Sequence, residues 1–313
     1  MKNILLLGGT GFIGKNIIEF YINDLEVNLI LVTRNKSNID ARLFSSERVT
    51  VNIGSISDID FIKKIVVDCN INVIIHLVSN LIASSSDEEF YEGMDNVIMP
   101  TFKLIDFIAN KEIKLLFFSS GGTIYGNANS RIDETTALNP INNYGFSKLL
   151  IEDYIYFKRS SSQLNCIVIR PSNVYGSFQS FIGNQGFISI AINKIYNNEP
   201  IVIWGDGNSI RDYIHVDDVV EVIQKLLSHS ISNTILNLST GVGKSLLEII
   251  EIIEKNLDKK AIVCFNNKRN VDANSVILDN SRLVATIPQE FISVEEGIKK
   301  QINYFIKSLE NVN

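Results

Sequence analysis

The sequence has 313 residues, of which 45% are hydrophobic and 20% are charged, and its formal net charge is −6 at pH 7. These values are typical of a folded globular protein with a sizeable core, and they exclude a disordered or fibrous chain. Sequence-independent binding of nucleic acid needs concentrated Lys and Arg, which an acidic chain lacks. We therefore expect one large domain or two modest ones, and no nucleic-acid partner.

The three cysteines, Cys69, Cys166 and Cys264, lie far apart in apolar or strand-like segments. Their odd number and wide spacing disfavour a disulfide framework and a metal cluster, so we expect no metal and a reducing compartment. The apolar run at residues 4–7 is too short for a secretory signal, and no run approaches the roughly 18 apolar residues of a membrane helix. We expect a cytoplasmic protein that does not bind a membrane.

The first half of the chain alternates strand-like runs with helical stretches. Strand-like runs occupy residues 3–7, 28–32, 49–53, 73–78, 114–120 and 166–170, and helical patterns occupy residues 12–22 and 59–69. Runs that are apolar on successive residues predict strands buried on both faces, as in a parallel sheet covered by helices. Residues 1–169 are therefore predicted to form a doubly wound, Rossmann-like α/β domain that binds a dinucleotide.

Beyond residue 169 the pattern changes to short strands mixed with helices. Strand-like runs occupy residues 200–204, 213–216, 234–239 and 261–265, and helical patterns lie near residues 187–196, 246–257 and 294–309. This mixture predicts a smaller mixed α/β lobe over residues 170–313, which binds substrate. The sequence does not decide whether segments after residue 169 also contribute to the first domain.

Three glycines, Gly8, Gly11 and Gly14, stand between the first predicted strand and the first predicted helix. Glycine there permits a tight turn and a close approach of backbone N–H groups to a pyrophosphate at the helix N-terminus. Together with Phe12 and Ile13 at the head of the helix, these glycines predict a dinucleotide site. The alternative is a glycine-rich turn without a ligand.

Tyr144 and Lys148 are four residues apart in "NNYGFSK", so a helix would place both side chains on one face. A tyrosine with an ordinary pKa near 10 is a poor proton acceptor at neutral pH, but a neighbouring ammonium favours its phenolate. The pair therefore predicts a general acid or base, although the same spacing is common on protein surfaces.

Six motifs occur in one order along nearly the whole chain: "GGTGFIG", "VIIHLVS", "SSGGTIYG", "NNYGFSK", "IRPSNVYG" and "IWGDGNSIRDYIHVDDV". With these motifs the chain resembles the extended short-chain dehydrogenase/reductase superfamily, in its nucleotide-sugar epimerase and dehydratase branch, to which UDP-galactose 4-epimerase belongs. The resemblance implies a nucleotide-sugar substrate and a homodimer formed through helices at residues 88–109 and 144–158.

The resemblance also implies roles for residues around the cofactor. Tyr144 would be the catalytic acid or base, and Lys148 would bind the nicotinamide ribose and favour the Tyr144 phenolate. Leu77 and Asn96 would lie beside the cofactor, with a purely structural role for Asn96 as the alternative. His76 is expected to pack rather than to take part in catalysis.

For the nucleotide sugar, the resemblance implies a second group of residues. Asn173, Arg211 and Arg269 match residues near the diphosphate, and bidentate guanidinium contacts suit phosphate oxygens. Val202 and Trp204 match positions that pack the base, for which an aliphatic and an aromatic side chain form a suitable slot.

Two positions depart from the pattern of the family. Gly121 stands where relatives carry a catalytic serine or threonine, so the neighbouring hydroxyls of Thr123 or Ser120 would have to replace it, and we favour Thr123. Thr33 stands where NAD-dependent relatives carry an acid that binds the adenosine ribose, and Arg34 follows it. An arginine there attracts a 2′-phosphate, which favours NADP(H) over the alternative, NAD.

Because a reductase consumes a hydride in each turnover, the preference for NADPH indicates a 4-ketoreductase. We expect it to act on a nucleotide-linked 4-keto-6-deoxyhexose of the dTDP-sugar type, in surface-polysaccharide precursor synthesis. The alternatives are an NAD-dependent C4-epimerase of a UDP-hexose or UDP-N-acetylhexosamine, and a non-catalytic dinucleotide-binding sensor. A 4,6-dehydratase is disfavoured because Gly122 and Thr123 replace its acid pair.

Overall fold

The computed structural model describes residues 1–36, 39–40, 43, 46–127, 131–183, 185–267 and 275–310. The chain divides into two compact units. Unit 1 contains Met1–Ile124, Leu138–Arg170 and Leu226–Leu236, and unit 2 contains Tyr125–Ala137, Pro171–Lys225 and Asn237–Asn313. The chain thus passes repeatedly between the units, and the assignment of cofactor and substrate to residues 1–169 and 170–313 stays a prediction.

Unit 1 is built on a seven-stranded sheet with the order β10-β6-β5-β4-β1-β2-β3. The strands are β1 (Lys2–Leu7), β2 (Val27–Thr33), β3 (Val49–Ile53), β4 (Val73–His76), β5 (Lys114–Phe118), β6 (Asn165–Pro171) and β10 (Ile235–Leu238). The pairs from β6 to β3 are all parallel. Because the chain winds outward in both directions from the neighbours β1 and β4, the predicted doubly wound fold is confirmed.

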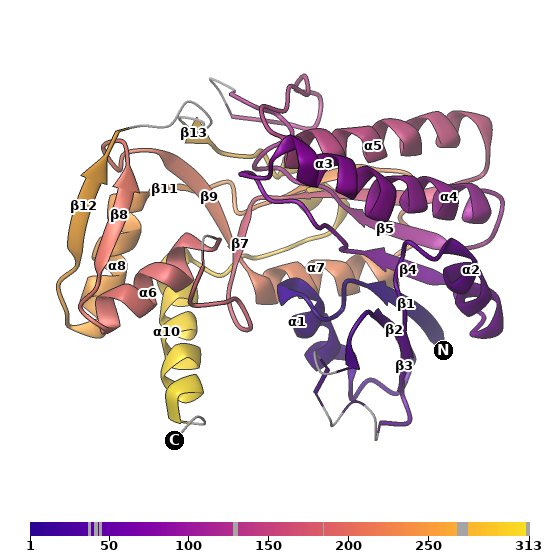
Figure 1. Cartoon of the computed structure of the whole chain (residues 1–313), viewed down its shortest axis with the longest axis horizontal. Coiled ribbons are helices and arrows are strands. Elements are labelled where there is room, and N and C mark those ends of the chain that lie inside the picture. The colour runs from indigo at the N-terminus through magenta and orange to yellow at the C-terminus, as the bar shows by residue number, and fades with distance from the viewer. Residues whose placement is uncertain are drawn as a thin grey trace. The chain divides into compact units, whose positions relative to one another are not determined.

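The helices of unit 1 are α1 (Phe12–Tyr21), α2 (Ile59–Asp68), α3 (Asp87–Gly93), the π-helical turn η3 (Met94–Ile98), α4 (Met99–Ile108) and α5 (Asn143–Ser161). Buried residues of α2, α4 and α5 share one core with alternate residues of the strands. Figure 1 shows these helices along the sheet. Leu5 and Leu7 belong to this core, so the residues between them, Ile4 and Leu6, face the other side of the strand.

Unit 2 combines short strands with helices. Its strands are β7 (Asn173–Tyr175), β8 (Pro200–Trp204), β9 (Ile210–His215), β11 (Gly243–Ser245), β12 (Ile262–Asn266) and β13 (Ser275–Val276), and its helices are α6 (Phe187–Tyr196), α7 (Val216–Ser228), α8 (Leu246–Leu257), α9 (Ser281–Thr286) and α10 (Val294–Glu310). The last three residues of α7 belong to unit 1. Strands β7, β11 and β13 pair with β9, and β12 pairs with β8. The smaller mixed α/β part is therefore confirmed.

The core of unit 2 is formed by α6, α8 and α10 together with residues of β8 and β9. Most of its buried residues are isoleucines, and on α8 they recur at helical spacing as Ile249, Ile250 and Ile253. Among the described residues of the chain, no helix has both the length and the apolar character that a membrane span requires.

Candidate active site

The glycine turn between β1 and α1 brings the three predicted glycines against one another. Gly8 has a φ of 89°, and its carbonyl oxygen accepts a hydrogen bond of 3.0 Å from the Gly11 N–H. A Cβ at Gly14 would lie 2.6 Å from the Gly9 Cα and closer still to the Gly8 oxygen, so only glycine fits. Within the described residues no side chain caps α1 at Gly11. The turn therefore fits an anionic pyrophosphate, which would accept hydrogen bonds from its N–H groups.

Leu77 borders the same turn from the end of β4. Its N–H donates to the Leu7 oxygen over 2.9 Å, and a Cβ added at Gly8 would lie 3.1 Å from the Leu77 Cβ. Phe12 and Ile13 begin α1 and are half-buried. The structure thus brings together six of the predicted cofactor residues at the carboxyl end of β1.

The end of β2 carries Arg34 to the same edge of the sheet, because Leu7 of β1 and Val32 of β2 are register partners. Thr33 is buried, and its hydroxyl donates to the Asn35 oxygen over 3.1 Å. Arg34 is exposed. The hydroxyl at the position of the usual acid is therefore tied into the local backbone, whereas the guanidinium reaches solvent.

The proposed reacting tyrosine lies in the first turn of α5. The Asn142 side chain caps this helix by accepting a hydrogen bond of 2.8 Å from the Gly145 N–H. A Cβ at Gly145 would lie 2.7 Å from the Thr123 oxygen, so the helix begins tightly against the loop after β5. The cap and this close contact together fix the position of Tyr144.

Ser120 is the hydroxyl whose interaction with the Tyr144 phenol lowers the pKa of Tyr144. The Thr123 hydroxyl donates to the Ser120 oxygen over 2.9 Å. The two candidate replacements for the serine lost at Gly121 are therefore bonded to each other, and Ser120 is the one that interacts with the phenol. Burial raises the pKa of Tyr144, and the Ser120 hydrogen bond opposes that rise.

Lys148 lies one turn further along α5 and is buried. Its Nζ donates to the Phe118 oxygen over 2.9 Å and lies 5.7 Å from the centre of the Tyr144 ring. Burial lowers the pKa of Lys148 to about 8, and the charge of Glu152 opposes this effect. A protonated Lys148 favours the phenolate form of Tyr144, so the pair fits acid–base chemistry.

His76 ends β4 inside the protein. Its Nε2 lies 3.0 Å from the Thr101 hydroxyl, which itself donates to the Val97 oxygen over 2.6 Å. The ring nitrogen must therefore be the donor to Thr101. Burial, helped by the charge of Lys148, lowers the pKa of His76 to about 3. The imidazole is consequently neutral, and its contacts suit the packing role predicted for it.

Asn96 lies in the π-helical turn η3 and is exposed. A π-helical turn within a helix often marks a functional site, because the extra residue changes the direction of side chains. This placement is compatible with either predicted role of Asn96, at the cofactor or in ordering the helix.

In unit 2, Asn173 and Arg211 lie on the paired strands β7 and β9. The Asn173 side-chain amide donates to the backbone oxygen of Asp212 over 2.9 Å. The buried Asp212 carboxylate accepts bonds of 3.2 and 3.0 Å from the backbone N–H groups of Thr240 and Gly241. Burial raises the pKa of Asp212 to about 6. These contacts hold β9, which carries Arg211, against β7, which carries Asn173.

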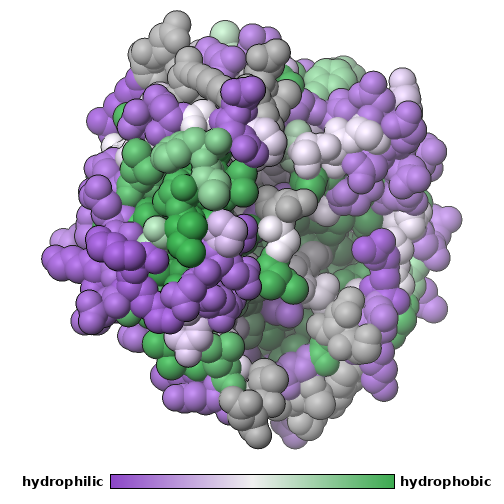
Figure 2. Space-filling view, turned by 60° about the vertical axis from the view of Figure 1, so that its left-hand side comes forward, coloured by the Kyte–Doolittle hydropathy of each residue, from purple (hydrophilic) through white to green (hydrophobic). Residues whose placement is uncertain are grey.

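Val202 and Trp204 alternate along β8 and share one face of it, where 43% and 42% of their surfaces are exposed. Ile262 and Phe265 of the neighbouring β12 are also exposed. Figure 2 brings the side with β8 and β12 forward and shows hydrophobic residues grouped among hydrophilic ones. Arg269 lies outside the described residues.

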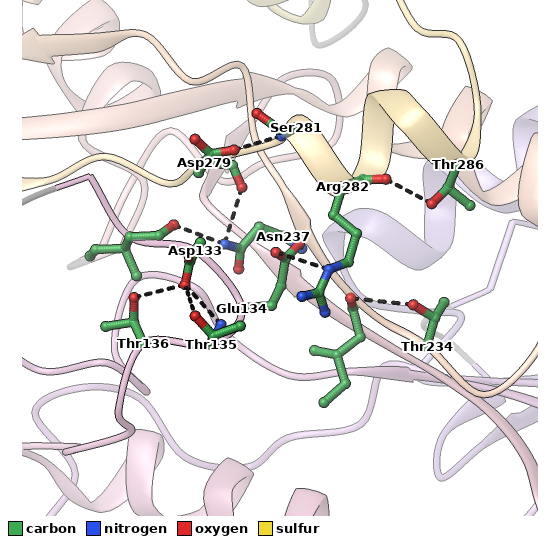
Figure 3. Close-up of polar contacts among 12 residues, drawn as sticks. Asp133, Glu134, Thr135, Thr136, Thr234, Asn237, Asp279, Ser281, Arg282 and Thr286 are labelled. Atoms are coloured by element: carbon green, nitrogen blue, oxygen red, sulfur yellow. Dashed lines mark hydrogen bonds and ion pairs between the residues drawn. The ribbon is translucent and has the colours of Figure 1, made fainter.

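A polar network in unit 2 involves residues for which no role was predicted. Asn237 is fully buried; its amide donates to the oxygens of Ile132 and Asp279 over 3.0 and 3.2 Å and accepts from the Tyr125 hydroxyl over 2.7 Å. Its backbone N–H donates to Glu134 over 2.8 Å, and Arg282 pairs with Glu134 at 3.5 Å. Figure 3 shows Glu134, Asp279 and Arg282, which come from distant segments, around Asn237. The network fixes the segment that follows the Ser120–Thr123 loop.

The doubly wound parallel sheet, the glycine turn after β1 and the Tyr144–Lys148 pair on α5 define a dinucleotide-dependent enzyme of the Rossmann-like class. Residues 4–239 match the NAD dependent epimerase/dehydratase family, and the chain belongs to that family. The predicted superfamily is thereby confirmed. The chain is an NAD(P)-dependent nucleotide-sugar enzyme.

Individual relatives carry two kinds of name. The chain is 33% identical to a dTDP-4-dehydro-6-deoxyglucose reductase of Escherichia coli, over 96% of each chain. It is 32% identical to a Methanocaldococcus jannaschii protein provisionally named UDP-glucose 4-epimerase, over 96% of this chain and 97% of that one. The structure of a UDP-glucose 4-epimerase of Thermotoga maritima with UDP-glucose is similar with a TM-score of 0.89 at 28% identity, over 98% of this chain and 99% of that one. These similarities support a nucleotide-sugar epimerase or reductase.

Proposed function

We propose that the protein is an NADPH-dependent 4-ketoreductase of a nucleotide-linked 4-keto-6-deoxyhexose. The observation that carries this proposal is the end of β2, where Thr33 is buried in a local turn and Arg34 is exposed. A guanidinium attracts a 2′-phosphate, and Thr33 stands at the position where NAD-dependent relatives carry the acid that binds an unmodified ribose. The similarity to the reductase of Escherichia coli supports the same choice.

The residues around Tyr144 suit the protonation half of such a reduction. When bound, the dinucleotide supplies the hydride that reduces the C4 carbonyl of the sugar. Tyr144 donates its proton to the oxygen of that carbonyl and becomes a phenolate, which the Lys148 ammonium stabilises. Ser120 receives a hydrogen bond from Thr123 and interacts with the phenol, so we infer that the two hydroxyls orient Tyr144. The glycine turn and Lys148 would hold the cofactor.

The residues of unit 2 would bind the nucleotide part of the substrate. Arg211 and Asn173, on neighbouring strands, supply donors for a diphosphate. The exposed pair of Val202 and Trp204 offers an apolar surface for a flat base. Arg269 is proposed as a second diphosphate ligand from its sequence context alone.

We also propose a homodimer formed through the helices next to Tyr144. Several large apolar side chains of this part of unit 1 are exposed, whereas Ile151 and Ile155 belong to the core. The exposed residues are Tyr91, Met99, Phe146, Tyr156 and Phe157. Light scattering should give about twice the chain mass of 35.1 kDa, and Phe146→Glu should reduce it to the mass of one chain. A monomeric wild-type protein at micromolar concentration would contradict the dimer.

The second candidate is a C4-epimerase of a UDP-hexose or UDP-N-acetylhexosamine. It is favoured by the structural similarity to the Thermotoga maritima epimerase. In that reaction Tyr144 would first accept the proton of the C4 hydroxyl and later return it. The same hydride would leave and return, so no added reductant is needed.

One pair of incubations separates these functions. The purified protein is mixed either with UDP-glucose without added cofactor, or with NADPH and a dTDP-4-keto-6-deoxyhexose. The reductase predicts NADPH oxidation in the second mixture and no UDP-galactose in the first. Formation of UDP-galactose would replace the reductase by the epimerase, and Tyr144→Phe should abolish either activity.

The cofactor preference is tested by Arg34→Asp. This change should lower the preference for NADPH over NADH at least tenfold, since it exchanges attraction of the 2′-phosphate for repulsion. Lys36→Asp changes a nearby exposed charge by the same amount and serves as the control. An unchanged preference in Arg34→Asp would refute the role of Arg34.

A further inference from the structure

Three charged residues are buried together where α5 packs on the sheet of unit 1. Lys148, Glu152 and Arg170 have only 3%, 6% and 2% of their surfaces exposed. The Arg170 Nε donates to the two Glu152 oxygens over 3.1 and 3.2 Å, and its Nη2 donates to Oε2 over 2.5 Å. A bidentate pair of this kind holds the carboxylate in one orientation.

The helical spacing connects this pair to the proposed reacting residues. Tyr144, Lys148 and Glu152 follow one another at intervals of four residues on α5, so they share one face of the helix. Arg170 follows Ile169 on β6, and Ile169 is the register partner of Phe118, whose oxygen accepts the hydrogen bond of Lys148. Both cations are thus anchored at the carboxyl ends of neighbouring strands.

The charges around Lys148 can be assigned element by element. Helix α5 contributes Tyr144 and Glu152, β6 contributes Arg170, and β4 contributes His76, which is neutral because burial lowers its pKa to about 3. Helix α4 contributes the uncharged Thr101 to the same layer. Glu152 is therefore the anion that offsets the cost of burying the Lys148 ammonium.

We propose that Glu152 is a positioning residue of the reaction: fixed by Arg170, its carboxylate keeps Lys148 protonated while Lys148 bonds to Phe118 and faces Tyr144. This inference rests on the proposed roles of Tyr144 and Lys148. Loss of the carboxylate would lower the pKa of Lys148, so the amine would become neutral at a lower pH than in the wild type. A neutral amine no longer stabilises the phenolate.

The first test is the pH dependence of kcat in Glu152→Gln. At an effective dielectric constant near 20, one charge a few ångströms beyond direct contact shifts the pKa of a neighbouring group by about two units. The alkaline decline of kcat should therefore begin about one to two pH units lower than in the wild type. Asp153→Asn removes an exposed charge from the adjacent position of α5 and should leave the profile within about 0.2 pH units.

Glu152→Gln also leaves Arg170 buried without its anion, so the single variant can lose stability for that reason alone. The double variant Glu152→Gln with Arg170→Met removes both charges and should fold at least as stably as the single variant. In the double variant the decline of kcat at alkaline pH should still begin at a lower pH than in the wild type. Wild-type pH profiles in both variants, with only the melting temperature changed, would overturn the proposal and leave the ion pair a purely structural one.

A second readout does not depend on activity. Lys148 titrates at a lower pH in the folded protein than in the unfolded chain, so the stability of the cofactor-free protein rises with pH through that interval. In the double variant this rise should start about one pH unit lower, and an unchanged onset would overturn the proposal. If Tyr144→Phe keeps full activity, the proposed function fails instead, and the stability measurement still tests the link between Glu152 and Lys148.

Discussion

Replacing Lys148 by methionine is predicted to stabilise the cofactor-free protein while destroying its activity. The ammonium is buried, with 3% of the residue exposed, and methionine has a similar length without a charge. The side chain would remain between the sheet and α5, beside the Phe117 ring that lies 5.2 Å from Nζ. Activity should fall because nothing then stabilises the Tyr144 phenolate.

The magnitude follows from the pKa of Lys148, which burial lowers from 10.5 to about 8. That difference means that burying the protonated Lys148 lowers the free energy of unfolding by about 3 kcal/mol at pH 7. Methionine also leaves the Phe118 oxygen without its 2.9 Å hydrogen bond, which costs about 1 kcal/mol. Lys148→Met should therefore raise the free energy of unfolding by about 2 kcal/mol at pH 7.

The sign of the pH dependence provides a second check. Between pH 8 and 10.5 the unfolded chain holds the Lys148 proton and the folded protein does not, so wild-type stability rises with pH. The advantage of the methionine variant should be largest below pH 8 and should vanish near pH 10, where the remaining gain equals the cost of the lost hydrogen bond. Urea unfolding at pH 7 and pH 10 measures both effects. A variant that is less stable than the wild type at pH 7 would refute the reasoning.

Three further changes test other parts of the structure. Asn237→Ala should lower the free energy of unfolding by about 3 kcal/mol, because three partners inside the fold lose their hydrogen bonds, whereas Thr136→Ala, which removes one 3.2 Å bond to the exposed Asp133, should cost under about 0.5 kcal/mol; equal effects in urea would contradict the network. Gly14→Ala should weaken NADPH binding in fluorescence titrations at least tenfold, since its Cβ would meet the backbone of the turn; wild-type affinity would disprove that packing. Ser120→Ala should reduce kcat more than Thr123→Val, because Ser120 is the hydroxyl that lowers the pKa of Tyr144; the reverse order would return the role to Thr123.

Local patterns were sufficient for the fold because a parallel strand covered on both faces must be apolar throughout, and the strand-like runs of unit 1 have that property. The same reasoning located the glycine turn, since Gly14 tolerates no Cβ in the close packing that the turn requires. The spacing of Tyr144 and Lys148 was enough to place them on one helix face. Each of these inferences depends on neighbours within a few residues in the chain.

Contacts between distant segments could not be read in this way. The sequence favoured Thr123 over Ser120, whereas in the folded loop it is Ser120 that interacts with Tyr144. The pairing of Glu152 with Arg170 depends on which strand lies beneath α5. The assignment of residues 125–137 to unit 2 likewise depends on contacts made by Asn237, more than one hundred residues later.

By itself, the sequence determined the class of fold and the side chains available for chemistry, because these follow from residue type and short spacing. It indicated the nucleotide-sugar enzyme family through its resemblance to that family in six ordered motifs. The tertiary structure decided which hydroxyl lies beside Tyr144, that Thr33 is tied to Asn35 while Arg34 reaches solvent, and which anion accompanies the buried Lys148. Those choices depend on burial and on long-range hydrogen bonds. Both arise only when the strands, helices and loops pack together.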